Sequence, residues 1–176
     1  MITASELIPN LATVTGFPEA TVRGVYRRHN EAGIVPVSHG ASVKKLDCRH
    51  VTMLLLALLA DMPIKDAAAS ACAYYALEDE NGNKVGDVLT NKLNSFRSVN
   101  DFAKLSYKSR IEIDCTAPRA CIISETAEGT IETLFGIRDK QWSDVRVRRS
   151  MTISGKVLFE IAMGLHFNRW NIKETV

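Results

Sequence analysis

The chain has 176 residues, enough for one domain or for a small module attached to a medium one. Hydrophobic residues make up 46% and charged residues 24%, which is typical of a globular protein with a packed core and argues against disorder. The net charge of +2 is too small to establish a nucleic-acid partner.

The start of the chain and its cysteines point to the cytoplasm. Residues 1–5 lack the basic start and the following apolar run of a signal peptide. The longest apolar run, Met53 to Ala60, is too short to cross a bilayer, so we expect no membrane partner. No C-x-x-C spacing is present, and the sequence predicts reduced, buried thiols for the four cysteines, Cys48, Cys72, Cys115 and Cys121.

The first 46 residues predict a small helical unit. Residues 5–15 predict one or two short helical pieces interrupted near Pro9. Gly16 suits a tight turn, and Pro18 suits the first turn of a second helix that runs to about Ala32. Residues 34–37 predict a short extended stretch, and residues 38–42 a polar loop that could be the tip of a wing.

Residues 11–35 carry a recognisable pattern. It consists of Ala12 in the first helix, Gly16 at the turn, apolar Phe17 after it, Thr21 and Val22 in the second helix, and an arginine-rich run that closes with residues 31–35. This pattern resembles the helix-turn-helix of bacterial and phage DNA-binding regulators, including winged and MerR-like forms. The resemblance extends over about residues 5–35 and covers roughly a fifth of the chain. Pro18 departs from it, because such motifs usually have a capping Ser or Thr there.

The resemblance implies that the second helix enters the major groove of double-stranded DNA. One face must then hold the helix on its scaffold, and the candidates are Val22, Val25, Tyr26 and Ala32. Small Ala20 and Gly24 on the outer face would let the helix sit deep, while arginines can pair with guanine edges or phosphates. The predicted DNA-binding residues are Glu19, Ala20, Thr21, Arg23, Arg27, Arg28, Lys44 and Lys45.

Other interpretations stay open for these basic residues. The helices at 5–32 could form a helical hairpin that happens to be basic. Lys44 and Lys45, with Arg49, could grip phosphate beside the wing, or they could equally be the exposed start of the next helix. A separate basic run, Arg146, Arg148 and Arg149, offers an alternative DNA-binding surface on a strand.

The middle of the chain predicts further helices. Asp47 can cap a helix over Cys48–Asp61, and an alanine-rich helix is expected over Ile64–Leu77. Residues 79–83 form the clearest loop, and helical periodicity resumes over residues 87–107. The Leu- and Ala-rich helices at 48–77 are candidates for a subunit contact, although monomer core is equally consistent with them.

From Ser109 the apolar period changes to two. Strands are expected over residues 110–114, 120–123, 130–135 and 145–153, and Ser154 can cap a final helix over residues 156–167. The fold class is therefore α+β: an N-terminal helical, helix-turn-helix half followed by a small antiparallel sheet with a C-terminal helix. We divide the chain into residues 1–46, 47–108 and 109–176. One side of the sheet would be lined by Ile111, Ile113, Ile122, Leu134 and Val147, with Leu158, Ile161 and Leu165 of the last helix packed on it.

The candidates for catalysis are few. Glu112 and Asp114 share a strand face, and Glu132 could lie nearby, so a metal-dependent nuclease is conceivable. Alternating charge on the wet face of a sheet is far commoner, and no phosphate-loop or dinucleotide motif occurs. We therefore expect no catalytic residues, no metal and no cofactor.

The sequence favours a sequence-specific DNA-binding regulator of phage or mobile-element type. One helix-turn-helix reads only a few base pairs, so we expect a homo-oligomer, with a dimer favoured. Two alternatives remain. One is a phage small packaging subunit that forms a larger oligomer on DNA. The other is a modulator of a host protein complex, whose C-terminal half binds a protein partner and whose DNA-binding module controls its own expression.

Overall fold

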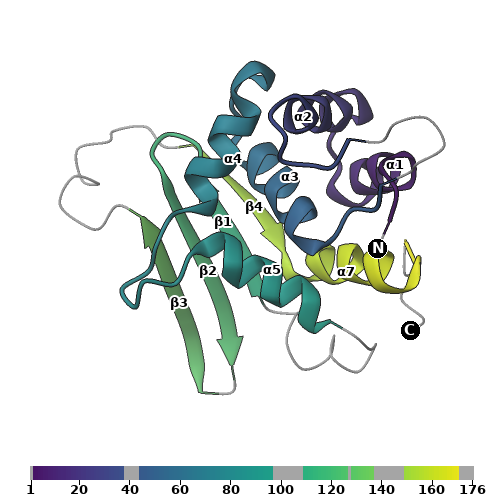
Figure 1. Cartoon of the computed structure of the whole chain (residues 1–176). Helices are drawn as coiled ribbons and strands as arrows, with labels where there is room; N and C mark the ends of the chain where they lie inside the picture. Colours follow the sequence, from purple (N-terminus) through teal and green to yellow (C-terminus); the bar gives the residue numbers. More distant parts are fainter. Residues whose placement is uncertain (1, 38–43, 97–108, 127, 137–148, 171–176) are drawn as a thin grey trace.

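The computed structural model describes residues 2–37, 44–96, 109–126, 128–136 and 149–170. Helices gather over one face of an antiparallel sheet, and the last helix lies among them (Figure 1). The predicted α+β class is confirmed. In chain order the elements are α1 (Ala4–Thr15), α2 (Glu19–Glu31), α3 (Cys48–Ala60), η1 (Ile64–Asp66), α4 (Ala67–Tyr75), α5 (Val85–Ser95), β1 (Ser109–Asp114), β2 (Arg119–Thr126), β3 (Gly129–Gly136), β4 (Ser150–Ser154) and α7 (Gly155–Phe167).

Helix α1 runs without interruption through Pro9, so the predicted break near that residue is wrong. A proline removes one backbone donor, which would have bonded the carbonyl four residues earlier, that of Ser5. Ser5 is exposed, so water can reach that carbonyl. The buried stripe of Leu7, Ile8, Leu11 and Ala12 holds the helix together against the cost of the missing bond.

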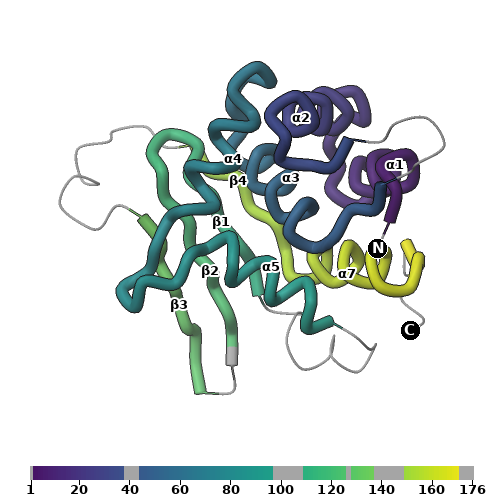
Figure 2. The backbone as a smooth tube through the Cα atoms, in the orientation of Figure 1, coloured from purple at the N-terminus to yellow at the C-terminus, as the bar shows by residue number. Residues whose placement is uncertain are grey.

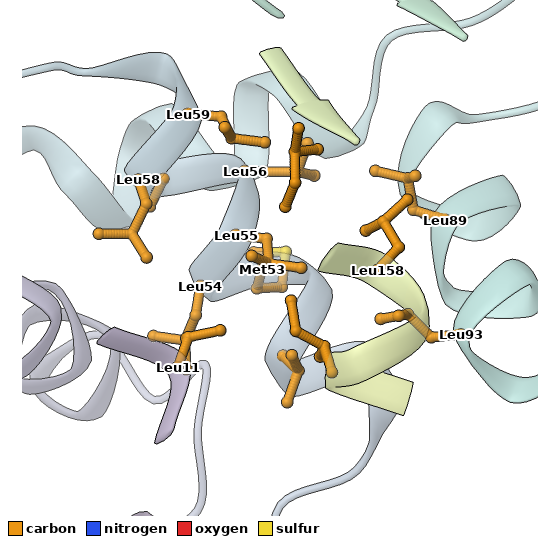
Figure 3. Packing of buried hydrophobic residues seen from close by; sticks show 14 of the residues in the cluster. Leu11, Met53, Leu54, Leu55, Leu56, Leu58, Leu59, Leu89, Leu93 and Leu158 are labelled. Atoms are coloured by element: carbon orange, nitrogen blue, oxygen red, sulfur yellow. The ribbon is translucent and has the colours of Figure 1, made fainter. Parts of the chain in front are cut away.

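Helix α3 is the centre of the molecule. The Asp47 carboxylate accepts the backbone N–H of His50 at 3.0 Å, which confirms the predicted cap. Eleven of its thirteen residues are buried. Figure 3 shows Leu54 turned toward Leu11, with Leu89, Leu93 and Leu158 on the other side of the helix. This part of the candidate subunit contact is therefore monomer core.

The region after α3 contains two helical stretches joined by a turn, in the order that the sequence predicted. The expected helix over residues 64–77 is divided into η1 and α4. Helix α5 follows a turn in which Asp79 accepts the backbone N–H groups of Asn81 and Asn83, at 2.8 and 2.9 Å. Of the helical stretch predicted over 87–107, residues 97–107 lie outside the described part of the chain.

The sheet has the strand order β3-β2-β1-β4, and every pairing is antiparallel. Its helix-covered face is lined by Ile111, Ile113, Ala120, Ile122, Phe135 and Ile153. Leu134 was expected on this face, but it pairs with Cys121 and faces the other way. The side chains of successive strand residues point to opposite faces of the sheet. A one-residue difference in the pairing of β3 therefore puts Phe135, and not Leu134, on the helix-covered face. Val147, the other residue predicted on this face, lies outside the described residues.

One hydrophobic cluster joins the two halves of the chain, from Ile2 to Leu165. Ser154 caps α7 as predicted, since its Oγ accepts the backbone N–H of Val157 at 3.4 Å. The tube in Figure 2 shows α7 reaching back to α1 at the beginning of the chain, and the two helices are in contact. Across residues 2–170, apart from the gaps given above, no helix combines the length and hydrophobicity needed to cross a bilayer.

Candidate nucleic-acid interface

The turn between α1 and α2 contains three residues, Gly16 to Pro18. Gly16 has a φ of +78°, a left-handed conformation that favours glycine, and its N–H donates to the Ala12 carbonyl at 2.9 Å. Phe17 packs in part against the hydrophobic core, and Pro18, with a φ of −55°, immediately precedes α2. The turn predicted from sequence is thus built as expected, and it places α2 across the helical layer (Figure 1).

A narrow apolar stripe attaches α2 to the rest of the protein. Val22 and Val25 are buried, as expected, and Tyr26 is half-buried. Ala32 was predicted in the same stripe, but it is exposed, and His29 takes that place. His29 lies seven residues, or two helical turns, after Val22, so the helical period puts it on the buried face despite its polarity.

The ring of His29 is fully buried between α2 and α3. Its Nδ1 lies 2.9 Å from the Val25 carbonyl, to which it donates as a neutral imidazole. Its Nε2 has no hydrogen-bond partner among the described residues. Burial lowers the pKa of His29, and the carbonyls of Val25 and Met53 oppose that shift. Burial therefore favours the neutral form of the His29 ring in the folded protein.

The opposite face of α2 is open to solvent. Glu19, Ala20, Arg23, Arg27 and Arg28 are exposed, and Thr21 is half-buried. Gly24 is less open than expected. A Cβ built on it would lie 3.2 Å from Cδ1 of Ile64 in η1, so η1 forms a wall along one side of the helix. Six of the residues predicted to face DNA thus share one helix, flanked by η1, and they are Glu19, Ala20, Thr21, Arg23, Arg27 and Arg28.

Each arginine of α2 makes an ion pair along the same helix. Arg23 contacts Glu19 at 2.5 Å, and Arg27 and Arg28 contact Glu31 at 2.8 and 2.7 Å. Hydrogen bonds from Arg27 and Arg28 lower the pKa of Glu31. The arginine side chains keep 64%, 77% and 43% of their exposure. Exposed pairs of this kind contribute at most about 1 kcal/mol, so a phosphate can replace the carboxylate as partner.

A groove of about 450 Å³ runs between α2 and the first half of α1. Its α1 wall contains Ala4, Ser5 and Ile8, and its α2 wall contains Arg23, Tyr26, Arg27, Asn30 and Glu31. Tyr26 was predicted only as a buried anchor, and Asn30 was not singled out. The spacing of Arg23, Arg27 and Asn30, by four and then three residues, was the available signal, because it places all three along one side of a helix.

Lys44 and Lys45 are exposed but do not belong to α2. The next residue, Leu46, pairs antiparallel with Ile2, and this bridge brings the lysines to the start of α1. Hydrogen bonds from Thr3 lower the pKa of Glu6 in α1, and the charge of Lys45 adds a smaller effect. The predicted wing tip, residues 38–42, lies outside the described part of the chain.

The alternative basic run is described only at its end. Arg149 contacts Asp61 at the C-terminal end of α3, with its Nη2 3.1 Å from the carboxylate and 3.3 Å from the carbonyl. Its backbone carbonyl accepts the N–H of Cys115 at 2.7 Å. Arg149 therefore joins α3 to the sheet, while Arg146 and Arg148 lie outside the described residues.

The carboxylates considered for catalysis do share one face of the sheet. Glu112, Asp114 and Glu132 line a hollow of about 390 Å³ there, but Arg110 and Arg119 lie among them. The Asp114 carboxylate accepts the backbone N–H groups of Thr116 and Ala117, at 2.7 and 3.1 Å. Among the described residues no group of three or more His, Cys, Asp or Glu side chains is arranged to hold a metal ion.

The cysteines divide by exposure. Cys48 and Cys121 are buried and Cys115 is partly buried, but Cys72 is exposed, so the prediction of burial fails there. Burial raises the pKa of the Cys48, Cys115 and Cys121 thiols. The Sγ of Cys48 lies 4.0 Å from Nε2 of His166, and the same nitrogen lies 3.1 Å from the Leu93 carbonyl, to which it can donate. The raised pKa of Cys48 disfavours the thiolate, which is the reactive form of cysteine.

Comparison of the chain with protein-family models, curated proteins and solved structures finds no match.

Proposed function

We propose that the protein is a sequence-specific DNA-binding regulator of phage or mobile-element type that inserts α2 into the major groove. The observation that supports this best is that α2 has one buried face and one exposed face. Val22, Val25 and His29 are buried, while Ala20, Arg23 and Arg27 are exposed around the opposite side. A recognition helix needs such a division, because one face must be held rigidly while the other reads base edges.

The groove beside α2 supplies a second kind of contact. Ser5 and Asn30 can donate to a phosphate oxygen at its rim, and Arg23 and Arg27 lie beside them. Lys44 and Lys45 add positive charge at the start of α1. In this proposal the arginines leave Glu19 and Glu31 when DNA arrives. A phosphate accepts the same kind of charge-assisted hydrogen bond, and its neutralisation also releases counterions from the DNA.

Dimerisation is part of the proposal. A single recognition helix reads too few base pairs for useful affinity, and a two-fold pair of helices doubles the site. Regulation of transcription in the cytoplasm, without catalysis and without a cofactor, follows from this use of the fold. A dimeric mass in solution would support it. A ring of many subunits would favour the packaging alternative, and retention of a large host complex would favour the modulator.

The test combines selection and mutation. Selection on random duplexes provides a preferred site, on which Arg23→Ala, Arg27→Ala and Arg28→Ala are compared with the wild type. A variant that loses a base contact should bind about 1–3 kcal/mol more weakly, and one that loses a phosphate contact should reduce the salt slope by about 1. Unchanged affinity in all three variants would refute the assignment of α2.

Arg110→Ala provides the matched control. Arg110 is exposed on the face of the sheet that the helices do not cover, so the same change of charge there should leave DNA affinity unaltered. The protein should also show no divalent-metal-dependent cleavage of DNA or RNA. Turnover that disappears in both Glu112→Gln and Asp114→Asn would contradict this proposal.

A further inference from the structure

A hollow of about 400 Å³ lies where the helix-turn-helix meets the sheet. Four separate parts of the chain line it. These are residues 15–17 at the α1–α2 turn, Leu59 near the end of α3, residues 151–154 of β4 and Val157 of α7. This volume falls in the range of pockets that hold small organic molecules, roughly 300–1,000 Å³.

The hollow follows the outer edge of β4. Successive residues of a strand point to opposite faces, so a hollow that touches all four residues from Met151 to Ser154 must lie along the strand's edge. Strand β1 occupies the other edge of β4, and no described strand pairs on this side. The backbone of β4 can therefore offer N–H and C=O groups to a ligand here.

The side chains of the lining favour an uncharged occupant. No acidic or basic residue belongs to it, so an ion would gain no opposite charge in exchange for the hydration that it loses. Phe17, Leu59 and Val157 supply apolar surface. Ser154 supplies a hydroxyl: its Oγ accepts the N–H of Val157, and its O–H keeps the capacity to donate.

We propose that this hollow binds a small uncharged molecule with an apolar body and an amide or carbonyl group. The apolar body packs against Phe17, Leu59 and Val157, and the polar group pairs with the edge of β4 and the Ser154 hydroxyl. The proposal does not rest on DNA binding. A molecule bound there would contact the α1–α2 turn and the sheet together.

The experiment uses the full-length, ¹⁵N-labelled protein and the neutral probe N-benzylacetamide. Saturable changes of backbone amide signals are expected at residues 15–17 and 151–154, with a dissociation constant of about 1–10 mM for a ligand of this size. Benzoate and benzylammonium have a similar shape but carry a charge, and they should bind at least ten times more weakly. Absent or scattered changes, or equal binding of a charged probe at these residues, would overturn the proposal.

Two variants locate the probe. Val157→Phe fills the hollow and should weaken binding at least tenfold, whereas Val88→Phe makes the same change on α5, also at a half-buried position, and should not. Phe17→Ala removes a wall without adding bulk, so it tests the same contact if Val157→Phe does not fold. Wild-type affinity in a folded Val157→Phe or Phe17→Ala variant would contradict this binding mode.

Discussion

Helices α2 and α3 have the same length, thirteen residues, but opposite relations to the core. Helix α3 buries eleven of its residues, and α2 buries three. Exposed α2 carries the three arginines of the proposed interface, while α3 contacts α2, α4, α5, β1 and β4. Stability and recognition are therefore assigned to different helices. The helix that organises the fold keeps only Arg49 and His50 outside the core, and the helix with a free surface contributes only three buried residues.

The helical half and the sheet half of the chain share one core. A single apolar cluster extends from Ile2 through α3 to Leu165 of α7. A fragment of residues 1–108 would therefore expose the side of α3 that packs on β1 and β4. We infer that the DNA-binding surface is best tested by substitutions in the full-length protein, because removing the sheet would also change the support of α2.

The largest effect is expected from a truncation in α3. Leu54 is fully buried, so Leu54→Ala should lower the free energy of unfolding by about 2–5 kcal/mol, through lost burial and the cavity left behind. Chemical denaturation monitored by circular dichroism measures this. Val14→Ala, at a half-buried position on α1, is the comparison and should cost less. A loss below about 1 kcal/mol for Leu54→Ala would mean that α3 is not the centre of the core.

The second effect separates affinity from stability. Arg27→Ala should weaken binding to a selected DNA site by about 1–3 kcal/mol while changing the free energy of unfolding by less than about 0.5 kcal/mol. The Arg27 side chain is 77% exposed and pairs only with Glu31 among the described residues, which explains the small structural cost. If denaturation showed a loss of stability as large as the loss of affinity, the affinity change would reflect folding instead of contact.

The helix ends and the main elements were predictable because their signals are local. The caps formed by Asp47 and Ser154 depend on a few neighbouring residues, as does the turn at Gly16. Which strand residues face the core was harder, since the position of Phe135 opposite Ala120 depends on pairing with another strand. The helical period predicts that His29 is buried. Because histidine is polar, apolar Ala32 was predicted in the buried stripe in its place. The wall that Ile64 forms beside Gly24 is a long-range contact, and no local pattern indicates it.

A third, smaller effect should appear on acidification. Burial lowers the pKa of His29 in the folded protein, so unfolding favours the protonated ring. The stability associated with neutral His29 is complete above about pH 6.5, the ordinary histidine value, and declines as the pH falls toward the lower folded pKa. Denaturation between pH 5 and 8 should show this slope, at most about 1.4 kcal/mol per pH unit, and His29→Leu should reduce it. A folded-state ring titration above the ordinary value would contradict the prediction.

The smallest effect is expected from Gly24→Ala. Its gain in helix propensity is partly offset by the crowding of the new Cβ against Ile64. Alanine is favoured over glycine in an exposed helix by about 1 kcal/mol. The new Cβ would lie 3.2 and 3.3 Å from Cδ1 and Cγ2 of Ile64, a side chain that is 42% exposed and can shift toward solvent. Gly24→Ala should therefore raise the free energy of unfolding slightly, by roughly 0–1 kcal/mol.

Gly86→Ala is the matched control, because the same change should there have the opposite sign. A Cβ on Gly86 would overlap the Tyr75 ring. That ring cannot shift easily, since its hydroxyl donates to Asp87 at 2.6 Å and the Arg49 guanidinium lies 5.6 Å from its centre. Overpacking of this kind costs about 1–3 kcal/mol. If Gly24→Ala were instead as destabilising as Gly86→Ala, η1 would hold α2 rigidly, and the wall beside the recognition helix would be a fixed part of the interface.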